Sequence, residues 1–219
     1  AYILKNAYHH FPEGSIHMIG IDAEATKTKQ HIACKVNGHF FIGPDTGIFS
    51  LMFPNLKADH IIALNITQES DSIPFPMKDL FVKAACHLNR GGTLGVIGRQ
   101  INQLKELKEF QPTLSADRKI LNGQVIYIDH YGNVISNITK KIFKESFAGT
   151  TYEIRLPRRN KITTIHKSYS QVPEGEMLAL FNSAGHLEIA INKGDTNLAN
   201  GASGLLGIKV KDRISIEFL

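Results

Sequence analysis

The hydrophobic pattern of this chain changes its period partway along, and this change limits the folds that the chain can adopt. Before Leu104, near-continuous apolar runs alternate with segments whose apolar side chains recur at helical spacing. Later apolar side chains alternate with polar ones in 152–156, 187–191 and 214–218. The polar segment Leu104–Arg118, which contains Pro112, separates the two patterns. The sequence therefore predicts two domains, residues 1–112 and 113–219.

The first domain is predicted to be an α/β domain with a mostly parallel sheet. Ser15–Asp22 is an apolar run that ends in a carboxylate, a pattern typical of a strand buried on both faces. We expect further strands at 31–36, 40–42, 60–66 and 93–97, and helices at 1–11, 47–53 and 79–88. Helices that alternate with buried strands form an α/β layer.

The second domain is predicted to be a small antiparallel β-barrel or sandwich. Its alternating strands are short, and glycine, asparagine and proline lie between them. Period-two alternation indicates strands with one face in a core and one face in solvent.

Composition and cysteine content restrict the environment of the protein. Among the 219 residues, 42% are hydrophobic, and no run approaches the roughly 18 apolar residues that cross a bilayer. We therefore expect no membrane partner. Cys34 and Cys86 have no metal-like spacing and fit two reduced thiols of a cytoplasmic protein. No metal site is predicted.

The net charge of +5 gives little support to a nucleic-acid partner. The densest basic cluster comprises Arg155, Arg158, Arg159 and Lys161, and the chain has no tryptophan that could stack on a base. We interpret this cluster as a solvent-facing hairpin tip. A nucleic-acid-binding barrel remains an alternative, and it predicts salt-sensitive binding at this cluster.

Two stretches of the second domain place polar groups at the ends of apolar runs. Residues 128–138 read I-D-H-Y-G-N-V-I-S-N-I, and residues 182–192 read N-S-A-G-H-L-E-I-A-I-N. Amides, carboxylates and free backbone groups at such a turn can bind a small polar ligand, although a strand that ends in a turn is the favoured interpretation of either stretch alone.

Two carboxylates of the first domain are further candidates. Asp22 ends a predicted strand, where α/β sheets bind ligands, but it could also cap the next turn. Asp45 could contact a ligand or cap the helix expected at 47–53, and we favour the cap.

In this order, the two stretches resemble the S-adenosylmethionine hydroxide adenosyltransferases, relatives of the fluorinase and chlorinase enzymes. The usual forms of that family are I-D-x-F-G-N-x-x-T-N-I and N-S-x-G-x-L-E-I-A-x-N. The resemblance covers the whole chain. It implies S-adenosylmethionine as substrate, no separate cofactor, and a homotrimer whose sites lie between the α/β domain of one subunit and the β domain of the next. It also predicts a strand and a helix that precede Ala1 in the native protein.

The resemblance assigns binding roles to the first stretch. Asp129 corresponds to a carboxylate that approaches the methionine amino group, Tyr131 to an aromatic that packs on adenine, and Asn133 to an amide that contacts the adenine edge. These assignments are chemically sensible, because carboxylates pair with ammonium groups and aromatic faces stack on bases.

Three later residues and one earlier residue complete the predicted binding set. Tyr169 corresponds to a second aromatic wall, and Ser183 to a contact of the methionine carboxylate. Asn192 begins a segment whose backbone closes over the adenine. Asp45 lies in G-P-D-T-G, which is similar to the family's G/A-P-D-N-G. Glu188 also matches the family, although an outward-facing strand position explains it as well.

The predicted catalytic residues are Asp22 and Lys29. The family has V-V-D-P-G-V-G at this strand end, and its Asp, an Arg and a His hold the attacking water. Asp22 matches, but Lys29 replaces the Arg and Pro76 stands at the position of the His. Lysine keeps the positive charge without the planar fork of donors.

The resemblance implies an adenosine-forming S-adenosylmethionine hydrolase, in which water attacks C5′ and methionine leaves. The alternative is a protein of the same fold that binds S-adenosylmethionine or adenosine without turnover, because the Arg and His of the family are replaced here. A halogenase is a poorer interpretation, because part of the segment that would build a halide pocket precedes Ala1.

Overall fold

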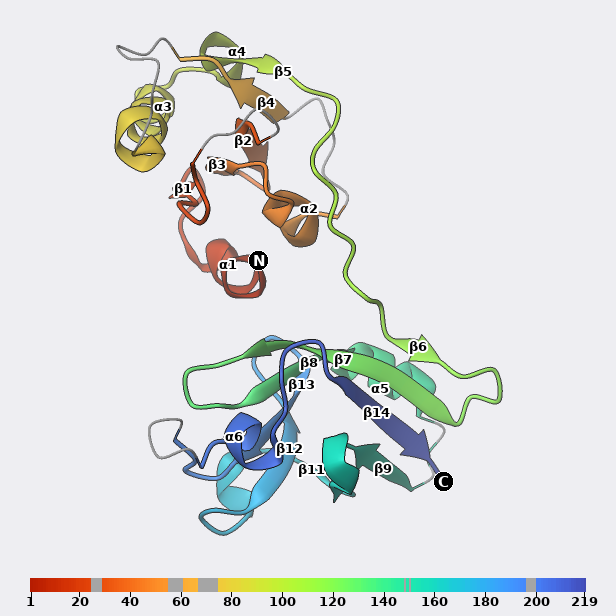
Figure 1. The fold of residues 1–219 in the computed structure, drawn as a ribbon. Helices are drawn as coiled ribbons and strands as arrows, with labels where there is room; N and C mark the ends of the chain where they lie inside the picture. Colours follow the sequence, from red (N-terminus) through yellow and green to blue (C-terminus); the bar gives the residue numbers. More distant parts are fainter. Residues whose placement is uncertain (25–28, 55–60, 67–74, 148, 150, 196–199) are drawn as a thin grey trace. The chain divides into compact units, whose positions relative to one another are not determined.

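Two compact units, Ala1–Glu109 and Phe110–Leu219, make up the computed structural model of the chain (Figure 1). The structure describes every residue except 25–28, 55–60, 67–74, 148, 150 and 196–199. None of the helices in this described part is long and apolar enough to cross a membrane.

The first unit is built on a five-stranded sheet with the order β1-β3-β2-β4-β5. Its strands are β1 (Ile16–Met18), β2 (His31–Val36), β3 (His39–Pro44), β4 (Ile61–Leu64) and β5 (Gly98–Gln100). Only the β1–β3 pair is parallel among these strand pairs, and the β2–β3, β2–β4 and β4–β5 pairs are antiparallel. The prediction of a mostly parallel sheet is therefore wrong.

A two-residue turn explains the antiparallel direction of β2 and β3. Asn37 and Gly38 both adopt positive φ angles, +49° and +81°, which is the backbone geometry of a tight hairpin turn. Asn-Gly is a strong hairpin signal. The apolar run 15–22 suggested a parallel sheet of strands buried on both faces, but it forms only the short edge strand β1, in which Met18 is 40% exposed.

Helices cover both faces of this sheet (Figure 1). On one face, Ala33, Ile42 and Ile62 belong to a core cluster with residues of η3 and α3; on the other, Ile32, Cys34 and Phe41 belong to a cluster with residues of α2. The helical elements are α1 (Tyr2–Ala7), η1 (Tyr8–His10), α2 (Ile48–Met52), the π-helical turn η3 (Met77–Phe81), α3 (Val82–Asn89) and α4 (Leu94–Ile97).

The helices expected at 1–11, 47–53 and 79–88 are confirmed in type. The strand expected at 93–97 is wrong, because Leu94–Ile97 forms the short helix α4. Only Ile97 of this helix is buried, and Val96 is largely exposed. The apolar run thus does not have the two-sided burial that the strand prediction assumed.

The second unit contains a nine-stranded, nearly barrel-shaped sheet with the order β10-β9-β14-β7-β8-β13-β12-β11, to which β6 adds through β7. All its pairs are antiparallel except β11 with β12. The predicted antiparallel β architecture of this part is confirmed. Its strands are β6 (Thr113–Leu114), β7 (Ile120–Ile128), β8 (Val134–Thr139), β9 (Tyr152–Arg155), β10 (Lys161–Ile162), β11 (Ile165–His166), β12 (Met177–Phe181), β13 (His186–Ile191) and β14 (Arg213–Phe218).

Alternating side chains of these strands form the core of the second unit. Ile154, Ile189 and Ile214 are fully buried in one cluster. The helices α5 (Lys140–Ser146) and α6 (Ala202–Leu206) add Phe143 and Ala202 to it, and the short 3-10 helices are η4 (Pro157–Arg159) and η5 (Tyr169–Gln171).

We predict that Phe41→Ala lowers the free energy of unfolding of the first unit by about 3–5 kcal/mol, because the ring is fully buried and its removal leaves a cavity. Phe75→Ala is the matched control, because this ring is 67% exposed and its loss should change stability by no more than about 0.5 kcal/mol. Urea denaturation of both variants measures the difference. Equal losses in the two variants would contradict the assigned core.

Candidate functional site

The loop between β7 and β8 is organised by the carboxylate of Asp129. Its Oδ1 accepts hydrogen bonds from the backbone N–H groups of Tyr131 and Asn133, both at 2.9 Å, and its Oδ2 accepts one from the Asn133 side-chain amide at 3.0 Å. Gly132 completes the turn with a φ of +79°. The three predicted binding residues of this loop therefore form one hydrogen-bonded unit in which the carboxylate has a fixed orientation.

Helix α6 and its N-cap residue Gly201 contact this loop. The backbone N–H of Ser203 donates to the carbonyl of Gly132 at 2.9 Å. At Gly201, a Cβ atom would lie 2.5 Å from the carbonyl oxygen of Tyr131, so only glycine permits this close approach. The side chain of Tyr131 stays 64% exposed and thus presents an aromatic ring to solvent.

A buried carboxylate links Tyr169 to the loop between β12 and β13. The Tyr169 hydroxyl donates to Glu188 Oε1 at 2.5 Å, and the Asn182 side-chain amide donates to Glu188 Oε2 at 3.1 Å. Glu188 lies in β13 and is buried, so the outward-facing strand position considered for it is wrong. Ser183 follows Asn182 in the turn and is exposed.

The charges of Glu188 and Asp129 both act on the Tyr169 hydroxyl. Burial raises the pKa of the Tyr169 hydroxyl far above its usual value, the hydrogen bond and charge of Glu188 raise it further, and the charge of Asp129 adds to the effect. These residues are far apart in the sequence, and their predicted roles were separate. The fold brings them into one electrostatic environment.

The sheet register decides which of the predicted residues share an end of the sheet. In the β8–β13 pair, His186 lies opposite Thr139 and Ile189 opposite Val134. The loop 129–133, which precedes β8, therefore lies at the end of the sheet where β13 ends. Asn192 directly follows β13 and lies at the same end. Ser183 lies at the opposite end of β13, and its connection to the other residues runs through Asn182, Glu188 and Tyr169.

Asn192 holds its own turn together. Its side-chain amide donates to the Val172 carbonyl at 2.8 Å, and its backbone N–H donates to the Glu176 carbonyl at 2.9 Å. The amide is thus engaged within the protein. The backbone carbonyl of Asn192 accepts from the backbone N–H of Gly175 at 2.9 Å, so a backbone contact with a ligand stays a prediction for the residues that follow Asn192.

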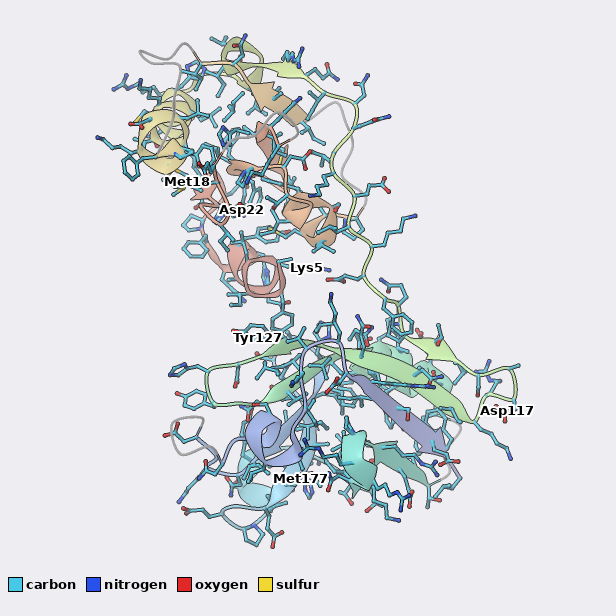
Figure 2. All side chains as sticks on the ribbon, in the orientation of Figure 1. Lys5, Met18, Asp22, Asp117, Tyr127 and Met177 are labelled. Carbon is cyan, nitrogen blue, oxygen red and sulfur yellow. The ribbon has the colours of Figure 1, made fainter. Side chains whose placement is uncertain are left out.

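In the first unit, Asp22 and Lys29 form an ion pair. Lys29 Nζ donates to Asp22 Oδ1 at 2.7 Å (Asp22 follows β1 and is labelled in Figure 2). The Asp22 side chain is 68% exposed, whereas that of Lys29 is 15% exposed. Asp22 has a φ of +51°, a left-handed conformation that disfavours most residues other than glycine, asparagine and aspartate. The structure thus brings the two predicted catalytic residues together.

Sequence reasoning missed His31, which contacts the same loop. Its Nε2 lies 2.6 Å from the carbonyl oxygen of Ala23, and its ring meets the Phe81 ring edge to face at a centroid distance of 5.1 Å. His31 begins strand β2 and is buried. The only available signal was a histidine at the start of an apolar run, two residues after Lys29.

Pro76 supplies no polar group at the position of the family's His, and Asp45 does not cap α2. Pro76 is buried, precedes η3, and supplies no donor or acceptor side chain. Both carboxylate oxygens of Asp45 accept from the backbone N–H of Lys105, at 3.1 and 2.9 Å. The prediction that Asp45 caps the helix is wrong, because the N-cap residue of α2 is Gly47, which has a φ of +94° and makes no side-chain cap hydrogen bond. Asp45 instead anchors the segment that follows β5.

The described residues contain no cluster of three or more histidine, cysteine, aspartate or glutamate side chains that could hold a metal ion. Three cavities in the described part of the chain are lined by residues other than the predicted site residues. Their volumes are about 350 Å³ beside Leu104, about 470 Å³ beside Arg90 and about 370 Å³ beside Arg213.

Comparison with known proteins gives matches along most of the chain. The N-terminal domain of the SAM hydroxide adenosyltransferases matches residues 1–98, and the C-terminal domain of that family matches residues 123–215. The (R)-S-adenosyl-L-methionine hydrolase of Methanocaldococcus jannaschii is 27% identical, over 100% of this chain and 77% of its own length. The hydrolase of the same name from Thermus thermophilus is 25% identical, over 92% of this chain and 77% of its own.

Solved structures agree with this match. The crystal structure of an uncharacterized conserved protein from Thermotoga maritima has a TM-score of 0.81 and 26% identity, over 98% of this chain and 81% of that one. The crystal structure of a conserved hypothetical protein from Thermus thermophilus has a TM-score of 0.71 and 24% identity, over 100% of this chain and 80% of that one, which supports the fold alone.

We predict that Glu188→Gln lowers the pKa of Tyr169 toward the ordinary tyrosine value, because it removes the charged acceptor that favours the protonated hydroxyl. The measurement is a pH titration of labelled tyrosine ring carbons by NMR, with Tyr169→Phe to assign its signal among the six tyrosines. Glu176→Gln, at an exposed carboxylate, is the control and should leave the titration unchanged. An unaltered Tyr169 titration in Glu188→Gln would refute the buried link.

Proposed function

The chain belongs to the S-adenosylmethionine hydroxide adenosyltransferase family, and from this premise we propose that it hydrolyses S-adenosylmethionine to adenosine and methionine. The observation that carries the proposal is the Asp22–Lys29 ion pair of 2.7 Å in the loop after β1. This pair retains a carboxylate and a cation at the two positions of the sequence where the family resemblance predicted catalytic residues.

The proposed reaction is a displacement at C5′ of the ribose. A water oxygen forms a bond to C5′ while the bond between C5′ and sulfur breaks, and its electron pair goes to sulfur. The leaving group is a neutral thioether that departs from a sulfonium, so the reaction needs no general acid. The water loses a proton as it attacks, and an acceptor placed behind C5′ assists this step.

Asp22 is the proposed acceptor and orienting group for the attacking water. Its side chain is largely exposed and therefore accessible to a water molecule. Lys29 is mostly buried and holds the carboxylate from one side, which limits the rotation of the Asp22 side chain. Lysine supplies one point of charge, whereas arginine would hold two oxygens in a fixed plane.

The loop 129–133 is the proposed binding site of the nucleoside and the methionine amino group. A carboxylate has about four lone-pair sites, of which Asp129 uses three within its own loop. The remaining site can accept a hydrogen bond from an ammonium group. The Asn133 amide nitrogen donates one of its two hydrogens to Asp129, which orients the amide, and its carbonyl oxygen can accept from an adenine amino group.

Aromatic side chains and the polar turns complete this proposal. Tyr131 presents an exposed ring on which adenine can stack, and Tyr169 supplies a second ring that Glu188 holds in place. Ser183 is proposed to contact the methionine carboxylate, and the backbone after Asn192 to close over the adenine.

Assembly and location form a further part of the proposal. We expect a homotrimer with its sites at subunit boundaries, as the family resemblance implies, and light scattering of the purified protein tests the mass. A cytoplasmic location is supported by Cys34 and Cys86, which are both free thiols.

We predict that Asp22→Asn lowers the rate of S-adenosylmethionine hydrolysis by about 100-fold or more, because an amide cannot accept the proton of the attacking water. Chromatography of adenosine and methionine formed by pure protein measures the rate. Glu24→Gln, at an exposed carboxylate two residues away, is the matched control and should keep the wild-type rate. Tight binding of substrate by the wild type without any product would overturn the hydrolase proposal.

A second prediction concerns the nucleoside site. Gly201→Ala should weaken adenosine binding by about tenfold, because a Cβ 2.5 Å from the Tyr131 carbonyl forces the loop 129–133 to move. Gly95→Ala serves as control, since a Cβ there meets no atom within 4 Å. Isothermal titration calorimetry with adenosine compares the variants. If Gly201→Ala binds adenosine as tightly as Gly95→Ala, the loop is not the binding site.

A further inference from the structure

Asp22 has a backbone conformation that few residue types adopt. Asp22 has a left-handed φ of +51°. The residues that follow it, Ala23 to Lys29, include neither glycine nor proline, the two residues that most strongly favour turns. Aspartate tolerates this conformation, so the direction of its carboxylate depends on the contacts that hold the turn.

His31 supplies such a contact from a rigid strand. Its Nε2 lies 2.6 Å from the carbonyl oxygen of Ala23, the residue directly after Asp22. Because a carbonyl oxygen only accepts, the hydrogen of this bond must lie on Nε2. A hydrogen bond this short restrains the peptide plane between Ala23 and Glu24, which lies one residue after Asp22.

The imidazole is itself held on several sides. His31 is 7% exposed, and its ring packs edge to face against Phe81, which is fully buried. Strand β2 lies between β3 and β4, and His31 is paired with Pro44 of β3. Next to it, the carbonyl of Gln30 accepts from the backbone N–H of Asp45 at 2.8 Å. These contacts hold the Nε2–H of His31 in one position.

We propose that His31 is a positioning residue for the hydrolysis: it holds the Ala23 carbonyl and thereby fixes the direction of the Asp22 carboxylate toward the attacking water. This inference rests on the proposed function. Lys29 and His31 restrain the same short loop through different atoms, the first through the Asp22 side chain and the second through the backbone. Together they restrain Asp22 and the residue that follows it.

A buried histidine in a strand can also serve stability alone, so the test must separate the two roles. His31→Leu keeps an apolar side chain beside Phe81 and removes the donor. His31→Gln keeps a donor at a position similar to Nε2. Cys34→Val is the matched control, because Cys34 is buried in the same strand and packs in the cluster on the other face of the sheet.

The experiment measures kcat and KM for S-adenosylmethionine hydrolysis, thermal stability, and hydrogen–deuterium exchange of the peptide that covers residues 19–24. We expect His31→Leu to lower kcat by about 10- to 100-fold with little change in KM, since a small displacement of a catalytic group has such an effect. Hydrogen–deuterium exchange of the peptide should rise in His31→Leu. His31→Gln should recover most of the wild-type kcat. Cys34→Val should keep the wild-type kcat and the wild-type exchange.

Several results would overturn the inference. One is a wild-type rate in His31→Leu. Another is a loss of kcat in His31→Leu that His31→Gln does not recover and that Cys34→Val shows to the same extent. If the wild-type protein has no hydrolase activity, the proposed function fails, and the exchange measurement still decides whether His31 holds the loop: unchanged exchange in His31→Leu refutes it.

Discussion

The two-sided burial of strand β2 is the constraint on which the first unit depends. Its residues alternate between two core clusters, so Ala33 packs with the helices on one face while Ile32 and Cys34 pack on the other. A strand covered on both faces cannot slip in register without burying its polar residues or exposing its apolar ones. The Asn37–Gly38 turn fixes the strand at one end, and His31 connects the other end to the loop of Asp22.

In the second unit, the loops are ordered by carboxylates that accept hydrogen bonds from backbone and side-chain donors. Asp129 organises the loop between β7 and β8, and Glu188 joins Tyr169 to Asn182. Buried or half-buried polar groups of this kind are stable only when their hydrogen bonds are made, which gives each loop one preferred geometry. The predicted binding residues are thus supported by bonds within the unit before any ligand arrives.

Two departures from the family pattern have different consequences. Lys29 keeps the ion pair with Asp22, so the loss of arginine preserves the charge and changes only the geometry. Pro76 supplies no polar side chain, and the structure offers instead a histidine from β2 that acts on the backbone of the same loop. His31 contacts a carbonyl rather than a reacting atom, which is why we assign it a positioning role.

Local patterns in the sequence predicted much of the secondary structure and the family. The helical spacing of 79–88 and the alternation of 187–191 and 214–218 were sufficient for the element type, because they depend on the period of one segment. The resemblance to the S-adenosylmethionine hydroxide adenosyltransferases, based on short motifs, is confirmed by the domain matches. The strand expected at 93–97 failed because an apolar run of five residues fits a buried strand or a short helix equally well.

The sequence by itself determined which residues carry charge, amide or aromatic groups at strand ends, since turn chemistry is local. Only the tertiary structure decided the antiparallel pairing of β2 with β4, the burial of Glu188, and the engagement of Asp45 with Lys105, because each depends on a partner distant in sequence or in another strand. The same holds for His31. The sequence shows the histidine, but its contact with Ala23 exists only because β2 and the turn of Asp22 meet in the fold.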